Sequence, residues 1–301
     1  MNKLRILIIG CVKFSYELTK KILENNRVEI VGICTKKKSD FNSDFVDLAI
    51  IAKKKRIPYI YSNNINTEHN KLWIKHKKPD YILCIGWPNL LSEKIFKIPK
   101  FFTIGYHPAD LPNNRGRNPL IWTIILDLKQ SASTFFKINK QPDAGEILLK
   151  KKFRISKNEN ASTLYKKVIN ISISQIDNLI LKLYKTRKKK ILIKKKDKKI
   201  LGNVLRKRVY KDGVIDWRMD AYSILRLVRA LNYPYPGASF YFKNKEYKVI
   251  SAKIVKSCPV VEPGKVIEKS KQFTIIKCGK YAIKILKLNQ KIYCKKGDYI
   301  L

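Results

Sequence analysis

Apolar and amphipathic segments alternate along the first 107 residues, and this alternation constrains the fold more than any other feature of the sequence. The run LRILIIG (4–10) is apolar and mostly β-branched, which is typical of a strand buried on both faces. A stretch with apolar residues at three- and four-residue steps follows at 15–26, and VEIVGICT (28–35) is a second strand-like run. The pattern repeats through FFTIGYH (101–107), so we expect a doubly wound, mostly parallel α/β sheet of the Rossmann-like kind.

The second half of the chain has a different pattern. Residues 131–138 and 146–153 are predicted to form two antiparallel strands around the turn NKQPDAG, and 160–184 a long amphipathic helix capped by Asn160 or Ser162. The lysine-dense segment 185–200 is interpreted as a linker or an edge strand. Beyond it, a helix that ends ahead of two prolines is followed by short strands at turn-marked spacing. We therefore expect two domains, 1–200 and 201–301, the second a smaller β-rich, barrel-like module of the OB type.

The charge of the chain has two explanations. Its 65 basic and 23 acidic residues give a formal net charge of +42, which attracts anions such as nucleic acid, acidic lipid headgroups or phosphorylated substrates. The basic residues are mostly lysines scattered along the chain, and isoleucine and asparagine are also plentiful, as AT-rich codon usage would produce. Nucleic-acid surfaces more often use arginine with interleaved aromatics, so the composition favours the codon explanation.

Composition also limits location and cofactors. The six cysteines show no CxxC or Cys/His spacing, so we expect no metal and reduced, structural thiols in the cytoplasm. The first apolar run is too short for a signal peptide or a membrane span, which predicts a soluble protein with no membrane partner. One glycine follows the first strand where a dinucleotide-binding fold would have GxGxxG.

His107, one of three histidines, is the strongest candidate for catalysis. It stands at the carboxyl end of a predicted parallel strand, where ligands bind in such sheets, and an imidazole can act as a general base near neutral pH. Asp143, in the turn between the next two strands, is expected to reach the same cleft, where a carboxylate would orient the imidazole. Arg115 and Arg117 are candidates for binding a phosphate or carboxylate, with Gly116 allowing close backbone approach.

Two segments resemble one known family. HPADLPNNRGRNPLIW (107–122) followed by QPDAGEI (141–147) is similar to the His-x-(Ser/Ala)-x-Leu-Pro-x-x-Arg-Gly segment and the Asp-x-Gly turn of the folate-dependent formyltransferases. That family includes methionyl-tRNA formyltransferase and the sugar N-formyltransferases. The resemblance extends to LIIGCVKFS (7–15) and, in the C-terminal domain, to the segment from RKRVYKDGVIDW to NYPYPGASFY.

The resemblance implies transfer of a formyl group from N10-formyltetrahydrofolate to a primary amine, without a metal. His107 would accept the amine's proton or stabilise the tetrahedral intermediate, and Asp143 would orient it. Backbone groups of Gly86, Trp87 and Pro88 would bind the pterin, together with Asp143.

One position departs from the family pattern. The family usually has an asparagine two residues before the histidine, where its amide stabilises the developing oxyanion, and this chain has Gly105. An oxyanion donor is commonly worth about 3 kcal/mol, so a substitute is needed. Asn89, Asn118 and a protonated His107 are the candidates.

The sequence leaves three functions open, two of which differ in the amine that is formylated. The preferred acceptor is a nucleotide-linked amino sugar for surface polysaccharide, because the family's tRNA enzymes carry a longer basic loop after the second strand than TKKKSDFNSDF provides. Arg115 and Arg117, or lysines nearby, would then bind the diphosphate. The alternatives are methionyl-tRNA formyltransferase, which the charge would suit, and a non-catalytic RNA-binding relative, which Gly105 would suit. Family likeness also implies a homodimer.

Overall fold

The computed structural model describes residues 3–39, 43–187 and 202–300, which form two compact units. The first unit comprises the described residues within Met1–Pro119, Gln130–Arg154 and Lys166–Leu205, and the second those within Leu120–Lys129, Ile155–Tyr165 and Arg206–Leu301. The expected boundary at 200/201 and most of the expected lysine-dense linker lie outside the described residues.

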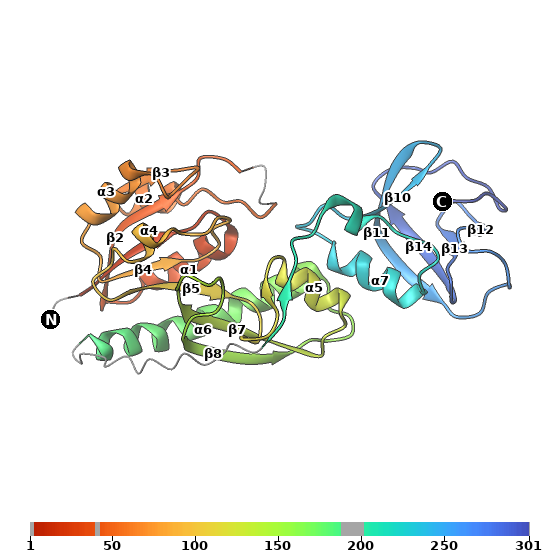
Figure 1. The fold of residues 1–301 in the computed structure, drawn as a ribbon. Coiled ribbons are helices and arrows are strands. Elements are labelled where there is room, and N and C mark those ends of the chain that lie inside the picture. Colours follow the sequence, from red (N-terminus) through yellow and green to blue (C-terminus); the bar gives the residue numbers. More distant parts are fainter. Residues whose placement is uncertain (1–2, 40–42, 188–201, 301) are drawn as a thin grey trace. The chain divides into compact units, whose positions relative to one another are not determined.

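The first unit is built on a seven-stranded sheet with strand order β3-β2-β1-β4-β5-β7-β8 (Figure 1). Its strands are β1 (Leu4–Ile9), β2 (Val28–Thr35), β3 (Tyr59–Tyr61), β4 (Tyr81–Cys84), β5 (Phe102–His107), β7 (Gln130–Lys137) and β8 (Ile147–Arg154). The strands β1 to β5 pair in parallel, and β7 and β8 add to the β5 edge in antiparallel pairs. The predicted doubly wound, mostly parallel sheet is therefore confirmed.

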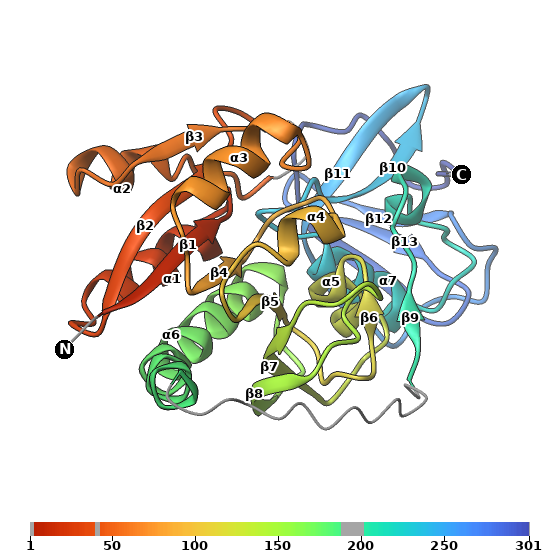
Figure 2. The ribbon, with the colours of Figure 1, turned by 60° about the vertical axis from the view of Figure 1, so that its left-hand side comes forward.

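Helices cover both faces of this sheet (Figures 1 and 2). They are α1 (Lys13–Leu23), α2 (Ala49–Lys54), α3 (Glu68–His76), α4 (Glu93–Phe96) and α6 (Ala161–Thr186). On one face, Phe14 of α1 stacks on Tyr106, and Ser172 of α6 hydrogen-bonds to the same tyrosine. On the other face, Ile74 of α3 and Ile95 of α4 join a core cluster with Leu7, Ile9 and Ile82 of the sheet. The helix α6 begins at the predicted cap, since the Asn160 side chain accepts the backbone N–H of Thr163.

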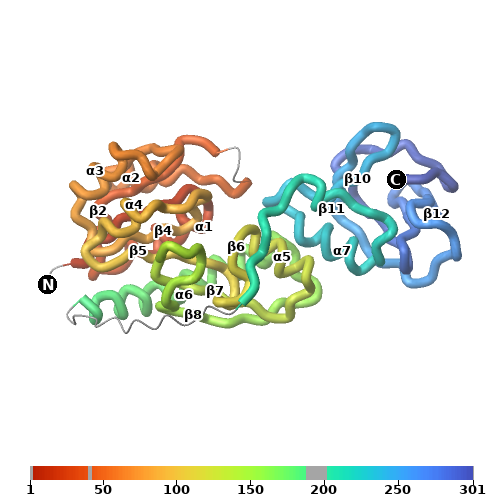
Figure 3. Tube along the Cα trace, viewed as in Figure 1, coloured from red at the N-terminus to blue at the C-terminus, as the bar shows by residue number. Residues whose placement is uncertain are grey.

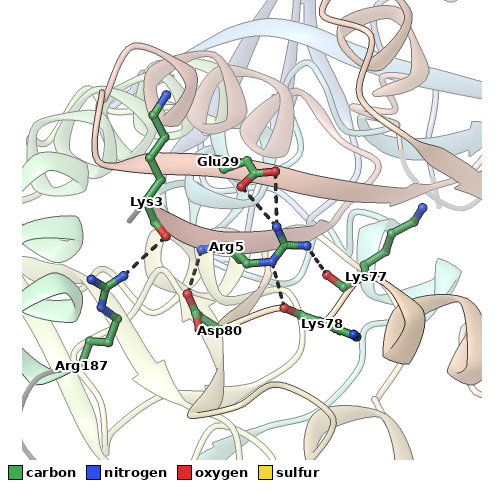
Figure 4. Close-up of polar contacts among 7 residues, drawn as sticks. All are labelled: Lys3, Arg5, Glu29, Lys77, Lys78, Asp80 and Arg187. Atoms are coloured by element: carbon green, nitrogen blue, oxygen red, sulfur yellow. Dashed lines mark hydrogen bonds and ion pairs between the residues drawn. The ribbon is translucent and has the colours of Figure 1, made fainter. Parts of the chain in front are cut away.

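An ion cluster stabilises the amino-terminal edge of the sheet (Figure 4). The Arg5 guanidinium donates to the carbonyl oxygens of Lys77 at 2.8 Å and Lys78 at 3.2 Å and pairs with Glu29 at 3.3 Å. The backbone N–H of Arg5 donates to the Asp80 carboxylate. These contacts fix the turn that leads into β4, so this edge has a structural explanation.

A second, two-stranded sheet joins distant parts of the first unit. Its strands β6 (Arg115–Gly116) and β9 (Val204–Leu205) pair in parallel, and the returning chain runs beside β6 (Figures 2 and 3). The sequence analysis did not predict this pair. It places residues just before the C-terminal domain against the loop that follows His107.

The second unit contains a five-stranded antiparallel sheet with strand order β10-β11-β14-β13-β12. Its elements are α5 (Pro119–Ile125), η1 (Tyr210–Gly213), α7 (Ala221–Ala230), β10 (Ala238–Phe242), β11 (Lys245–Val255), β12 (Val266–Lys269), β13 (Thr274–Lys277) and β14 (Ala282–Leu288). The apolar face of α7 packs on β11 and β14, and Asp220 caps its first turn. The predicted β-rich C-terminal module is confirmed.

Within the described segments, no helix combines the length and the apolar character needed to cross a membrane.

Candidate active site

His107 ends β5 at the carboxyl edge of the parallel strands, and only 5% of its surface is exposed. Its Nε2 lies 2.8 Å from the carbonyl oxygen of Asn114. A carbonyl can only accept a hydrogen bond, so Nε2 carries the proton in this pair. The neutral imidazole then has its lone pair on Nδ1, which makes Nδ1 the atom that can accept a further proton.

Asp143 lies beside that nitrogen. Its Oδ2 is 3.7 Å from His107 Nδ1 and accepts the backbone N–H of Gly116 at 3.0 Å. Asp143 has a left-handed backbone (φ 54°), and a Cβ on Gly145 would come within 1.6 Å of the Lys137 carbonyl oxygen. The Asp-x-Gly turn therefore needs its glycine in order to carry the carboxylate toward His107.

A cavity of about 170 Å³ opens next to this pair. Its walls include Trp87, Leu90, Phe136 and Ile138, and Asp143 contributes to its lining. Cavities of about 150 Å³ can hold a benzene ring, so this one suits a single flat heterocycle. The lining combines apolar walls with a few polar groups, as expected of a ligand pocket.

The loop after β4 forms one side of the cavity. Gly86 has a left-handed backbone (φ 66°), and its carbonyl accepts the N–H of Cys11 at 3.3 Å. The Pro88 carbonyl accepts the Arg117 guanidinium at 2.8 Å. The indole N–H of Trp87 is buried and has no partner among the described residues. The Gly86 and Pro88 carbonyls therefore each accept a hydrogen bond from within the protein, whereas the Trp87 indole N–H is available to donate one to a ligand.

The two predicted anion-binding arginines have different surroundings. Arg115 is 6% exposed and donates to the Gly202 carbonyl at 3.3 Å, because pairing of β6 with β9 covers it. Arg117 is exposed and reaches the loop after β4 through Pro88. Both lie outside the set of described residues that line the cavity.

Gly105 faces Phe136 across the β5–β7 pair and lies in the cavity lining. A Cβ at Gly105 would come within 2.7 Å of Phe136 Cζ and 3.1 Å of Ile138 Cγ1. The phenylalanine ring therefore fills the space that a side chain at this position would need. An asparagine does not fit here without movement of Phe136.

The three candidate oxyanion donors are now placed. The Asn89 side chain lines the cavity and makes one long hydrogen bond of 3.5 Å to the Asn63 carbonyl. Asn118 lies outside the described cavity lining. His107 Nε2 is engaged with Asn114. Asn89 is thus the candidate that lies beside the ligand space.

Other ionisable groups nearby have structural roles. Burial raises the pKa of the Tyr106 hydroxyl to about 12. This hydroxyl forms hydrogen bonds with Ser133 and Ser172 on the face of the sheet that α1 and α6 cover. Burial likewise raises the pKa of the Cys84 thiol to about 12, so Cys84 lines the cavity as a neutral thiol. Neither group can serve as a base or a nucleophile near neutral pH.

Asp110, in the segment after His107, fixes that segment to β8. Burial raises the pKa of the Asp110 carboxyl, but hydrogen bonds and ion pairs with Lys150 at 2.7 Å and Lys152 at 3.1 Å outweigh burial and leave this pKa lowered. Asp110 is therefore charged and paired.

The sequence analysis missed several residues of the site. Asn114 orients His107, Phe136 covers Gly105, and Gln141 contributes to the cavity lining. The Pro/Gly-rich composition of residues 108–119 indicates a loop with special backbone conformations. It does not predict that the Asn114 carbonyl accepts a hydrogen bond from His107.

Fold and site together define a class: a two-unit α/β protein with an imidazole–carboxylate pair beside a ligand-sized cavity at the carboxyl edge of its parallel sheet. The chain belongs to the formyl transferase family, whose N-terminal family model, described as formyl transferase, matches residues 2–176. The model described as formyl transferase, C-terminal domain, matches residues 207–296. The predicted family and the predicted formyltransferase activity are thereby confirmed.

Relatives within and near the family differ in what they act on. The methionyl-tRNA formyltransferase of Caldanaerobacter subterraneus subsp. tengcongensis is 27% identical over 99% of this chain and 96% of its own length. The bifunctional polymyxin resistance protein ArnA of Wigglesworthia glossinidia brevipalpis is 32% identical over 77% of this chain, which corresponds to 35% of that protein. An N-formyltransferase from Helicobacter canadensis, solved with folinic acid and dTDP-3-aminofucose, has a TM-score of 0.66 at 16% identity and covers 95% of this chain and 99% of its own.

Proposed function

We propose that the chain transfers a formyl group from N10-formyltetrahydrofolate to the primary amine of a nucleotide-linked amino sugar. The observation that best supports formyl transfer is the position of the His107 imidazole beside the cavity. Its Nδ1 atom, which has the lone pair, lies 3.7 Å from Asp143 Oδ2. The cytoplasmic location and the homodimer stay predictions.

The cavity residues fit a folate donor. The volume of about 170 Å³ is enough for one ring of a pterin, and the buried Trp87 indole N–H is a donor that an acceptor on a ligand would satisfy. Asn89, Gln141 and Asp143 add polar groups to an otherwise apolar lining. The related Helicobacter canadensis structure holds folinic acid. Bound in this cavity, the folate would supply the formyl group.

In the proposed mechanism, His107 Nδ1 accepts the proton of the acceptor amine as the new carbon–nitrogen bond forms. The bond between the formyl carbon and N10 breaks, and the proton returns from His107 to N10 of the leaving tetrahydrofolate. Asp143 stabilises the transient positive charge on the imidazole. The Asn89 amide would stabilise the developing negative charge on the formyl oxygen.

Three observations support a sugar nucleotide as the acceptor. The segment between β2 and α2 runs only from Lys36 to Leu48, which is short beside the long basic loop that the family resemblance assigns to tRNA enzymes. Lys36 Nζ lies 5.5 Å from the centroid of the Trp87 ring, and Lys140 contributes to the cavity lining. Cationic groups that could bind a diphosphate therefore lie close to the cavity. The related structure with dTDP-3-aminofucose supports the same class of acceptor.

Methionyl-tRNA is the second candidate, because one observation favours it. The match to a methionyl-tRNA formyltransferase covers 99% of this chain and includes the C-terminal unit. A net charge of +42 would also favour binding to the phosphate backbone of a tRNA. The family match counts against the third possibility, a non-catalytic RNA-binding relative, which predicts RNA binding with steep salt dependence and no turnover.

A competition assay separates the three. The protein is incubated with N10-formyltetrahydrofolate, a panel of dTDP- and UDP-linked amino sugars and methionine-charged initiator tRNA, and each acceptor is followed by mass. A formylated sugar nucleotide supports the proposal. Formylation of the charged tRNA alone would replace it with the second candidate, and RNA binding without any product would favour the third.

A further inference from the structure

The two proposed catalytic groups lie on different parts of the chain, and one short segment contacts both. The Asn114 carbonyl accepts from His107 Nε2, and the Gly116 N–H donates to Asp143 Oδ2. The separation of imidazole and carboxylate therefore depends on where residues 114–116 lie.

Residues 203–205, which include β9, run beside that segment (Figure 2). Two side-chain hydrogen bonds join Asn203 to Asn114: the Asn114 N–H donates to Asn203 Oδ1 at 2.8 Å, and Asn203 Nδ2 donates to Asn114 Oδ1 at 3.0 Å. The Arg115 N–H donates to the Asn203 carbonyl at 3.2 Å, and the Arg117 N–H to the Leu205 carbonyl at 3.1 Å. Together these bonds fix 114–116 from outside the main sheet.

The fit along this pair is close. Gly116 has a left-handed backbone (φ 100°), and a Cβ there would come within 2.3 Å of the Leu205 carbonyl oxygen. Asn114 also has a left-handed backbone (φ 58°), which asparagine adopts more readily than most residues. A shift of β9 would therefore move both the carbonyl that orients His107 and the N–H that orients Asp143.

We propose that Asn203, the residue just before β9, is a positioning residue for the His107–Asp143 pair. The inference rests on the proposed function. Asn203 is exposed, so its hydrogen bonds to Asn114 add little to global stability, and their removal acts mainly on the orientation of Asn114. Small misplacements of catalytic groups can reduce rates strongly.

Kinetics of Asn203→Ala test this role. We expect kcat to fall roughly 10- to 100-fold while KM for the folate donor stays near the wild-type value, because the cavity is untouched. Asn114→Asp is the conservative comparison and should keep most of the activity, since its carboxylate still accepts the Asn203 Nδ2 bond. Val204→Ala is the matched control. Val204 is the next residue along the chain, begins β9 and is 65% exposed, so truncation of its side chain should leave kcat unchanged.

A second readout does not depend on turnover. In wild type, the Nε2 proton of the buried His107 should exchange slowly with solvent in nuclear magnetic resonance spectra, since it donates to Asn114. In Asn203→Ala we expect exchange to be about 10-fold faster. Should Asn203→Ala fail to fold, Asn114→Gly removes the bond from Asn203 Nδ2 to Asn114 Oδ1 without backbone strain and keeps the bond from the backbone N–H of residue 114 to Asn203 Oδ1. We expect the same changes in kcat and in exchange from this variant, each smaller than in Asn203→Ala.

The outcomes separate the two claims. A wild-type protein without turnover on any acceptor rejects the proposed function, while the exchange measurement still decides whether Asn203 orients His107. An active wild type with kcat of Asn203→Ala within about twofold would overturn the inference. So would a parallel loss of folate binding and of melting temperature, because that would show general loosening instead of positioning.

Discussion

Gly105 and Phe136 are register partners on β5 and β7, and the Phe136 ring lies 2.7 Å from where a Cβ on Gly105 would stand. We therefore expect Gly105→Asn, which would restore the family's usual amide, to harm the protein instead of improving it. Overpacking of this kind costs about 1–3 kcal/mol. Thermal unfolding and kcat of this variant check the expectation.

The double variant Gly105→Asn/Phe136→Ala isolates the cause. Removing the ring makes room for the asparagine, so the double variant should be more stable and more active than Gly105→Asn alone. Phe136→Ala alone controls for the cavity that the substitution creates. If Gly105→Asn alone matches wild type in stability and gains activity, the packing argument is wrong.

His107→Gln should lower kcat by about 10²- to 10⁴-fold, the usual contribution of a general base. Folate binding should persist, because His107 lies outside the described cavity lining. His76→Gln, on the exposed face of α3, is the matched control and should leave kcat unchanged. A rate for His107→Gln close to wild type would remove His107 from the mechanism.

Asp143→Asn should lower kcat less than His107→Gln does, because the amide can still accept the Gly116 N–H through its oxygen. It cannot stabilise a charged imidazole as a carboxylate does. Steady-state kinetics with unchanged circular dichroism would support this order of effects. The reverse order, with Asp143 the more important residue, would indicate that the carboxylate is the base.

Gly145→Ala should disrupt the turn that carries Asp143, because its Cβ would come within 1.6 Å of the Lys137 carbonyl oxygen. We expect a lower melting temperature together with a large loss of kcat. Gly297→Ala is the comparison: Gly297 has a positive φ (92°), but an added Cβ there has no neighbour within 4 Å. That variant should cost about 1 kcal/mol in stability and leave kcat intact.

The Asp212–Arg206 pair predicts a pH-dependent stability of the second unit. Hydrogen bonds from Arg206 at 2.6 Å lower the pKa of Asp212 to about 2, so its contribution is present above its ordinary pKa of about 4 and is lost as the pH falls toward 2. Asp212→Asn should therefore lower the melting temperature at pH 7, and the difference from wild type should shrink at pH 3. Arg206 is exposed and Asp212 is partly exposed, so solvent screens the pair and the effect should be small. Lys211→Gln, a neighbouring charge change, should show no such pH dependence.

Local patterns were sufficient to predict the main sheet and the proximity of His107 and Asp143. The strand ending at His107 was readable because β5 is a continuous apolar run, and Asp143 stood in a turn between two clear strands. Both groups lie at element ends, and element ends in a parallel sheet converge on one edge.

Long-range pairing could not be predicted in the same way. The strands β6 and β9 have two residues each and lie almost 90 positions apart, so neither has a periodicity to detect. As a result, the sequence indicates Arg115 as a candidate for binding an anion, although pairing with β9 buries it. The Gly105–Phe136 contact likewise depends on the β5–β7 register, which composition does not determine.

The most direct test of the account is a single-turnover experiment with N10-formyltetrahydrofolate labelled in its formyl group. Wild type, His107→Gln and His76→Gln are each mixed with the acceptor that the panel identifies, and the label is followed into the product by mass. We predict transfer by wild type and His76→Gln, and little or none by His107→Gln despite normal folate binding. Equal transfer by His107→Gln, or folate binding with no transfer by wild type to any acceptor, would contradict the account.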